Sequence, residues 1–196
     1  MNADNGSPFW YTAEGYGEAS LAAIDDAVYV RSYNGSLFAL RASNGSPIWQ
    51  YSAGYAGLSA PTVSNGMIYL NSISNLGIPN VQALKTSDGS VLWQTEMHII
   101  SSPVVVDGTL YAGGGGDDQF NVYALRAENG ALLWHWHTFS PQGNIGGPIV
   151  VDNVVCTSIG AASGLYALQA HDGRLLWHSL RGENITAPVG GRVVNF

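Results

Sequence analysis

Short apolar runs recur along the whole chain, separated by turns rich in Gly, Asn, Asp and Ser. Runs of this kind, bounded by turn residues, are typical of short β-strands. No segment of ten residues keeps the 3.6-residue period of an amphipathic helix. The pattern therefore predicts an all-β protein built from many short strands joined by tight turns.

One eleven-residue phrase occurs four times, and each copy consists of two apolar runs joined by a turn. The clearest copy spans residues 124–134, and the others span residues 39–49, 83–93 and 167–177. The turn carries Asn-Gly or Asp-Gly, the strongest short hairpin signal, because these pairs tolerate positive φ. Residues 5–10 hold a shortened fifth copy. Each phrase predicts a hairpin that ends in Trp.

The Trp residues that end the phrases lie 39 to 44 residues apart, at Trp10, Trp49, Trp93, Trp134 and Trp177. A period near 40 residues with four strands per unit is typical of a β-propeller blade. We expect a single propeller or half-propeller domain over residues 1–196, made of four-stranded antiparallel blades. Complete blades are expected at residues 19–51, 59–95, 101–136 and 146–179. Residues 5–11 and 187–195 are expected to supply partial strands of a further blade.

The five phrase-ending Trp residues are interpreted as structural rather than as ligand-stacking groups. A flat indole fills the wedge between adjacent blades and buries roughly 150–250 Å². Its N–H needs a partner, most simply a backbone carbonyl of the next blade. The small Ala at the start of each phrase leaves room for a neighbouring ring.

Composition and charge exclude several partners. The formal net charge is −7 and Lys85 is the single lysine, so the basic patch that phosphate-backbone binding requires is absent. No run of 18 apolar residues predicts a membrane span. The lone Cys156 excludes an internal disulfide. Residues 1–4 do not read as a signal peptide, so the expected location is cytoplasmic as written, or periplasmic or secreted after removal of a leader.

The repeated phrase resembles the tryptophan-docking motif of the pyrroloquinoline-quinone-type propellers, Ala-x-Asp-x-x-Thr-Gly-x-x-x-Trp. The matching positions are Ala39, Gly45 and Trp49; Ala83, Gly89 and Trp93; Ala124, Gly130 and Trp134; and Ala167, Gly173 and Trp177. The Asp of the motif is replaced by Arg41, Lys85, Arg126 and Gln169, and its Thr by Asn44, Asp88, Asn129 and Asp172. The resemblance covers nearly the whole chain and implies a propeller of this kind.

The resemblance implies the scaffold of this family but not its enzymatic activity. Its quinone dehydrogenases hold their cofactor with a disulfide between adjacent cysteines, and hold Ca²⁺ with Glu, Asn and Asp. This sequence has one cysteine, and no Glu-Asn-Asp set maps onto its motif positions. We therefore expect no catalytic residues and no cofactor. Similar propellers without a cofactor serve as protein-binding platforms, including a bacterial outer-membrane assembly lipoprotein.

Two groups of residues could hold a metal, and each also has a simpler interpretation. His135 and His137 are two apart on a predicted outer strand, so both imidazoles point to one face, but no third ligand is evident. Asp117, Asp118 and Asn121 could offer hard oxygens to Ca²⁺ beside the glycine run of residues 113–116. An exposed strand edge and a flexible loop are the favoured interpretations, so no metal is expected.

Three functions remain open at this stage. The favoured one is a non-enzymatic propeller scaffold whose blade loops bind a protein or peptide. The alternatives are a fragment of a quinone-dependent dehydrogenase and a segment of a larger propeller sensor or receptor.

The number of blades predicts how the chain assembles. Eight blades turn by about 45° each, so four cover about half a ring. The first and last blades would each expose an apolar face, of the kind that marks an interface. We therefore favour a homodimer that closes the ring, with residues 5–11 and 187–195 at the junctions. A ring closed within one chain by a hybrid fifth blade is the rival arrangement.

Overall fold

The computed structural model describes most of the chain and shows only β-structure in the part that it describes. That part comprises residues 7, 10, 19–32, 34–52, 59–74, 76–116, 119–139, 145–159, 164–179 and 192–195. None of these residues forms a helix, and so none forms one that could span a membrane. The predicted all-β fold class is confirmed.

Sixteen of the strands form four antiparallel four-stranded sheets, which are the blades. The first blade contains β1 (Ala19–Ile24), β2 (Ala27–Ser32), β3 (Ser36–Arg41) and β4 (Pro47–Ser52). The second contains β5 (Thr62–Ser64), β6 (Met67–Ile73), β7 (Pro79–Lys85) and β8 (Val91–Glu96). The third contains β9 (Val104–Val106), β10 (Thr109–Gly116), β11 (Gln119–Arg126) and β12 (Leu132–Phe139). The fourth contains β13 (Ile149–Val151), β14 (Val154–Ile159), β15 (Gly164–Gln169) and β16 (Leu175–Ser179).

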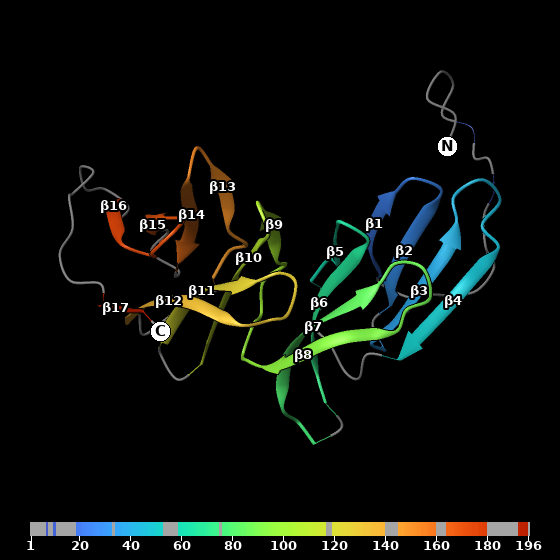
Figure 1. Cartoon of the computed structure of the whole chain (residues 1–196), viewed down its shortest axis with the longest axis horizontal. Coiled ribbons are helices and arrows are strands. Elements are labelled where there is room, and N and C mark those ends of the chain that lie inside the picture. The colour runs from blue at the N-terminus through green and yellow to red at the C-terminus, as the bar shows by residue number, and fades with distance from the viewer. Residues whose placement is uncertain are drawn as a thin grey trace.

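The blades follow one another in chain order across the molecule (Figure 1). The first strand of each blade contacts the first strand of the next, from β1 to β5, β9 and β13. Trp49, Trp93, Trp134 and Trp177 lie on the fourth strands, on the side of each sheet away from the first strand. This is the propeller arrangement, with blades stacked face to face around an inner edge.

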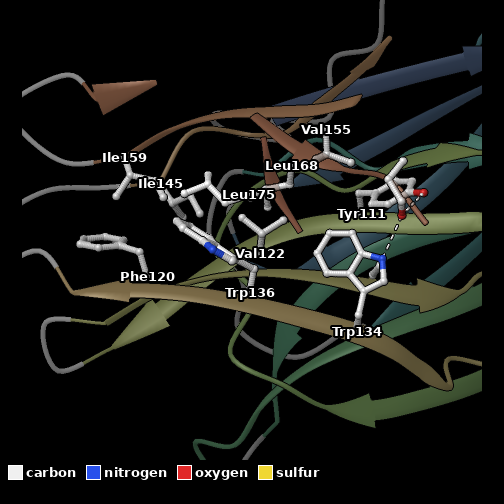
Figure 2. Packing of buried hydrophobic residues seen from close by; sticks show 12 residues of the cluster. Tyr111, Phe120, Val122, Trp134, Trp136, Ile145, Val155, Ile159, Leu168 and Leu175 are labelled. Atoms are coloured by element: carbon white, nitrogen blue, oxygen red, sulfur yellow. Dashed lines mark hydrogen bonds between the residues drawn. The ribbon is translucent and has the colours of Figure 1, made fainter. Parts of the chain in front are cut away.

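The core of the protein lies between blades rather than within any one of them. One cluster joins the first two blades through Tyr29, Leu37 and Ile68, and another joins the second and third. The third cluster, between the third and fourth blades, is shown in Figure 2 and contains Trp134 and Trp136. The second and third blades therefore bury both faces against neighbours, whereas the first and fourth each have one neighbour among the described blades.

The phrase turns have a different geometry from the two-residue hairpin that the sequence predicts. In the first copy the Gly45 amide donates to the Arg41 carbonyl at 2.8 Å, and Gly45 alone has positive φ. The Asn44 side chain instead accepts a hydrogen bond from the Ser46 amide at 3.0 Å. Asn or Asp is therefore present as a side-chain acceptor that fixes the turn, as in an Asx turn. Each turn is followed by a bulge beside the Ala that pairs with the Trp.

The last described strand, β17 (Arg192–Asn195), does not begin a fifth unit as the sequence predicts. It pairs antiparallel with β12, on the outer edge of the third blade. An outer strand offers a row of unpaired backbone N–H and C=O groups, which a free extended segment can satisfy. Most of residues 187–195, and all but Ser7 and Trp10 of residues 5–11, lie outside the described part, so the partial blade stays a prediction.

The glycine run of residues 113–116 forms the end of strand β10 rather than the flexible loop expected from the sequence. The segment before β9 runs along this strand, with Ile99 in a bridge to Gly114. A Cβ on Gly114 would lie 1.9 Å from the His98 carbonyl oxygen. Glycine is present here because two backbones approach too closely for a side chain, as is common for a glycine within a strand.

Candidate functional site

Four of the five phrases direct the indole N–H of their Trp at the backbone of the following blade. In four copies the Nε1 atom lies 2.7–2.9 Å from a carbonyl oxygen. The pairs are Trp10 with Ala42, Trp49 with Thr86, Trp93 with Ala127, and Trp134 with Ala170. These bonds satisfy donors that would otherwise cost about 1–3 kcal/mol each if buried without a partner.

A glycine three residues after each of these carbonyls provides the surface on which the indole lies. Gly45, Gly89, Gly130 and Gly173 all have φ of 71–72°, in the left-handed region. A Cβ on any of them would come within 2.5–2.7 Å of an indole carbon. Only glycine meets both requirements without strain. We call the carbonyl and its glycine a dock, and name each dock by these two residues.

A tyrosine on the second strand packs beside the phrase Trp of the same blade in three of the four blades. The ring centroids of Tyr29, Tyr69 and Tyr111 lie 5.8–6.1 Å from those of Trp49, Trp93 and Trp134. Tyr111 also donates its hydroxyl to the Ala170 carbonyl at 3.2 Å, and burial raises the pKa of Tyr111. In the fourth blade the corresponding residue, opposite Ala167, is Cys156. Its face therefore lacks the second ring.

The face of the fourth blade that points away from the third is apolar and exposed. The strand pairing places Ile149, Val151, Cys156, Leu165 and Trp177 on this face. Ile149, Val151 and Leu165 are 61%, 59% and 42% exposed. The Trp177 indole has no hydrogen bond to any other described residue, unlike the four docked indoles. We call these five residues the open face; a contiguous apolar surface of this kind marks an interaction site.

The first blade differs from the fourth, although the sequence predicts that both expose an apolar face. On its face away from the second blade, Val30 and Leu40 are 5% and 1% exposed, while Leu21 is 62% exposed. Trp10 fills the Ala42/Gly45 dock beside this face, where the Trp of a preceding blade would lie. The expectation of two open apolar faces is therefore wrong for most of the first blade.

Arg31 is a buried charged residue that sequence reasoning did not identify as important. It lies on β2 and is 2% exposed. Its Nη1 donates to Ser59 Oγ at 3.0 Å and to Asn71 Oδ1 at 2.9 Å, and its Nη2 donates to the Asn71 carbonyl. Burial lowers the pKa of Arg31 to about 10, and its Nε has no partner. The network links β2 to the segment that enters the second blade.

The predicted histidine pair is present on β12. The imidazoles of His135 and His137 are stacked with centroids 5.9 Å apart on one face of β12. Burial, and then the nearby charge of His137, lowers the pKa of His135. Within the described residues no three His, Cys, Asp or Glu side chains gather around one point.

The residue between these histidines corrects the expectation of an exposed strand edge. Trp136 is 1% exposed and packs among Phe120, Val122 and Ile145, as Figure 2 shows. Its indole Nε1 is buried and has no hydrogen-bond partner. It was missed because it lies outside the repeated phrase, and alternation with Trp134 along the strand is the signal that could have identified it.

The other weak metal candidates cannot be placed as a group. Asp117 and Asp118 lie outside the described residues. Asn121 lies on β11, opposite Gly114 on one side and His137 on the other.

A groove of about 630 Å³ opens between the turn ends of the third and fourth blades. Its walls include the aromatic rings of Tyr111 and Trp134, and its rim includes Asp107, Asp152 and His171. Two carboxylates at this groove suit a cationic side chain of a peptide.

Comparison with known proteins places this fold in a family. A family model described as "Outer membrane protein assembly factor BamB" matches residues 1–158 and, in a second overlapping match, residues 79–195. The BamB of Yersinia pestis is 27% identical over 183 residues, covering 79% of this chain and 45% of that protein. The chain therefore spans less than half of that relative.

Two solved structures show the same fold at low sequence identity. The crystal structure of BamB from Moraxella catarrhalis superposes with a TM-score of 0.61 at 20% identity, covering 97% of this chain and 72% of that one. The quinohemoprotein alcohol dehydrogenase ADHIIG from Pseudomonas putida HK5 superposes with a TM-score of 0.67 at 17% identity, covering 81% and 33%. At these identities the likeness concerns the fold alone.

Proposed function

Because the chain belongs to the family of the outer membrane protein assembly factor BamB, we propose that it is a non-catalytic propeller scaffold that closes its ring by pairing between two chains. The observation that carries the proposal is the open face of the fourth blade. Every other described interface between blades buries such a face against a neighbour. A second copy offers its first blade, whose Ala42/Gly45 dock has the same geometry as the docks that Trp49, Trp93 and Trp134 fill.

The geometry of propellers supports pairing of two four-bladed chains. Propellers have four to eight blades, and eight blades require a turn of about 45° each. Two chains related by a two-fold axis along the channel would place each fourth blade against the first blade of its partner. Such closure removes the exposed apolar residues from water, which stabilises the dimer by about 25 cal/mol for each Å² of apolar surface buried.

The scaffold's ligand is proposed to be a protein or peptide held at the blade loops. The relatives in this family are named as assembly factors for outer membrane proteins, which is a role in protein assembly. The groove between the third and fourth blades provides two carboxylates, those of Asp107 and Asp152, and the imidazole of His171. These features suit a cationic or polar segment of a partner protein, and the net charge of −7 favours the same partner.

Light scattering after size exclusion tests the pairing. The expected mass is about 41 kDa, twice the 20.7 kDa of one chain. Ile149→Asp, on the open face, is expected to shift the protein toward the monomer because it introduces a charge into the contact. Leu76→Asp is the matched control, since Leu76 is 85% exposed and lies on a loop of the second blade. A clean monomer at micromolar concentration would contradict the proposal.

A second candidate function, a fragment of a quinone-dependent dehydrogenase, is favoured only by the likeness of fold to the alcohol dehydrogenase. The residues do not fit that cofactor. The single cysteine, Cys156, lies on the open face, so the disulfide between adjacent cysteines that holds the quinone in this family cannot form.

We expect quinone-dependent dye reduction with simple alcohols or sugars to stay at background, with or without Ca²⁺. The assay is run on the full chain with added pyrroloquinoline quinone, and a known quinone dehydrogenase serves as the positive control. A Ca²⁺-dependent rate above background would revive the dehydrogenase hypothesis and remove the non-catalytic part of the proposed function.

A further inference from the structure

The dock of the first blade is filled, whereas the phrase Trp of the fourth blade, Trp177, has no dock among the described residues. The Ala42/Gly45 dock of the first blade is filled by Trp10, whose Nε1 donates to the Ala42 carbonyl at 2.7 Å. A Cβ on Gly45 would lie 2.5 Å from the Trp10 ring, as close as at the docks filled by Trp93 and Trp134. Trp10 therefore makes the same contacts as an indole from a preceding blade.

Trp177 is the indole whose dock is missing among the described residues. It occupies the same register position in its blade as Trp49, Trp93 and Trp134, each opposite the Ala of its phrase. Each of those three indoles reaches the dock of the next blade. In a ring closed by two copies, the next blade after the fourth is the first blade of the partner, and its dock is Ala42/Gly45.

We propose that Trp10 and the Trp177 of a second copy compete for the Ala42/Gly45 dock, so that Trp10 acts as a built-in competitor of ring closure. This inference rests on the proposed pairing of two chains. One dock offers one glycine surface and one carbonyl oxygen in line with it, so it holds one indole at a time. The open face then closes fully only after Trp10 has left the dock.

The competition has a defined thermodynamic form. Trp10 belongs to the same chain as the dock, so its binding there is intramolecular and it competes at a high effective concentration. The apparent affinity of a second copy equals its affinity for a free dock multiplied by the fraction of docks that are free. A dock filled about 90% of the time therefore weakens each junction about tenfold. Removing the competitor should strengthen dimerisation by at least that factor.

Four variants of the full chain test the competition through the dimer dissociation constant, measured by sedimentation equilibrium. Trp10→Ala is expected to lower the dissociation constant by about tenfold or more. Trp177→Ala is expected to abolish the dimer. The double variant is expected to behave like Trp177→Ala, because a free dock cannot stabilise the dimer when the second copy has no indole to bind there. Trp10→Phe, which keeps a ring but loses the N–H bond, should fall between wild type and Trp10→Ala.

The indole N–H signals in a ¹H–¹⁵N spectrum of Trp-labelled protein give an independent readout. The signal that disappears in Trp10→Ala identifies Trp10, and it should move from its docked position as the concentration of wild-type protein rises through the dimer range. The same spectra show whether each variant is folded, because the signals of Trp93 and Trp134 should keep their positions. Ile149→Asp provides a second monomeric variant if Trp177→Ala does not fold.

The outcomes separate this inference from the proposed function. If wild type and Trp10→Ala both stay monomeric, chain pairing is wrong and the competition is wrong with it. If wild type dimerises through the open face but Trp10→Ala dimerises equally or more weakly, pairing stands and the competition is wrong. A weaker dimer in Trp10→Ala would place Trp10 within the junction, as part of a hybrid blade. Dimerisation that survives Trp177→Ala would also overturn the inference.

Discussion

Replacing Trp134 by alanine is expected to lower the free energy of unfolding by about 3–5 kcal/mol, the range for truncating a large buried aromatic residue. Trp134 is 1% exposed and lies in the cluster between the third and fourth blades with Val155 and Leu168 (Figure 2). Its removal leaves a cavity where two blades meet, and it also breaks the bond to Ala170. Urea denaturation followed by near-ultraviolet circular dichroism measures the loss.

Trp136 is expected to show a comparable loss on replacement by alanine, because it is also 1% exposed and in the same cluster. The two positions should differ in the stability that is lost when each Trp is replaced by phenylalanine. Trp134→Phe loses a hydrogen bond of 2.9 Å, whereas Trp136→Phe removes a buried N–H that has no partner. An unsatisfied buried donor costs about 1–3 kcal/mol, so the phenylalanine variant of Trp136 should be the more stable of the two.

This pair of substitutions separates packing from hydrogen bonding at one interface between blades. Equal midpoints for the two phenylalanine variants would mean that the N–H bond of Trp134 contributes nothing to stability. A loss of less than about 1 kcal/mol for Trp134→Ala would mean that the indole does not fill the space between blades.

The blade count and the strand order could be predicted from the sequence because each blade contacts the next through the same set of residues. Each phrase needs an indole long enough to reach the next blade, a glycine that accepts it, and a small Ala beside it, and these needs recur every 39 to 44 residues. The glycine of the turn serves two purposes, positive φ and contact with the indole, as Gly89 does under Trp49. Repetition makes such a pattern visible in one sequence.

Features that occur once in the chain could not be predicted in the same way. Arg31 follows the apolar residues of β2, and only the structure shows that Asn71 and Ser59 surround it in the next blade. Trp10 could be recognised as the end of a phrase, but its effect on the face of the first blade depends on where its dock lies. The sequence therefore predicted which residues form the phrases, but it did not predict which blade faces remain exposed.

The glycine run of β10 shows most clearly why composition misleads in a strand. Four consecutive glycines suggest a flexible loop, because glycine loses more conformational entropy on folding than any other residue. Here the segment before β9 lies against the strand, with the Gly115 amide donating to the His98 carbonyl at 3.2 Å. The absence of Cβ atoms is what allows this second backbone to approach, so the glycines are required by packing.

Gly114→Ala is accordingly expected to lower the free energy of unfolding by about 3 kcal/mol or more, at the upper end of the cost of overpacking. The added Cβ would lie 1.9 Å from the His98 carbonyl oxygen and 2.9 Å from the Tyr123 ring, and a backbone atom cannot move aside as a flexible side chain can. The segment of residues 98–101 must then shift away from β10, with loss of its bridge at Ile99.

Gly147→Ala is the matched control, because Gly147 is exposed and the nearest atom to its added Cβ, the Ser102 carbonyl oxygen, lies at an ordinary contact distance of 3.5 Å. Its effect should stay within about 0.5 kcal/mol of wild type. Urea midpoints and amide hydrogen exchange at residues 98–101 measure both variants. If Gly114→Ala matched the control in both measurements, the two backbones could not lie as closely together as the structure places them, and the glycine run would be a loop after all.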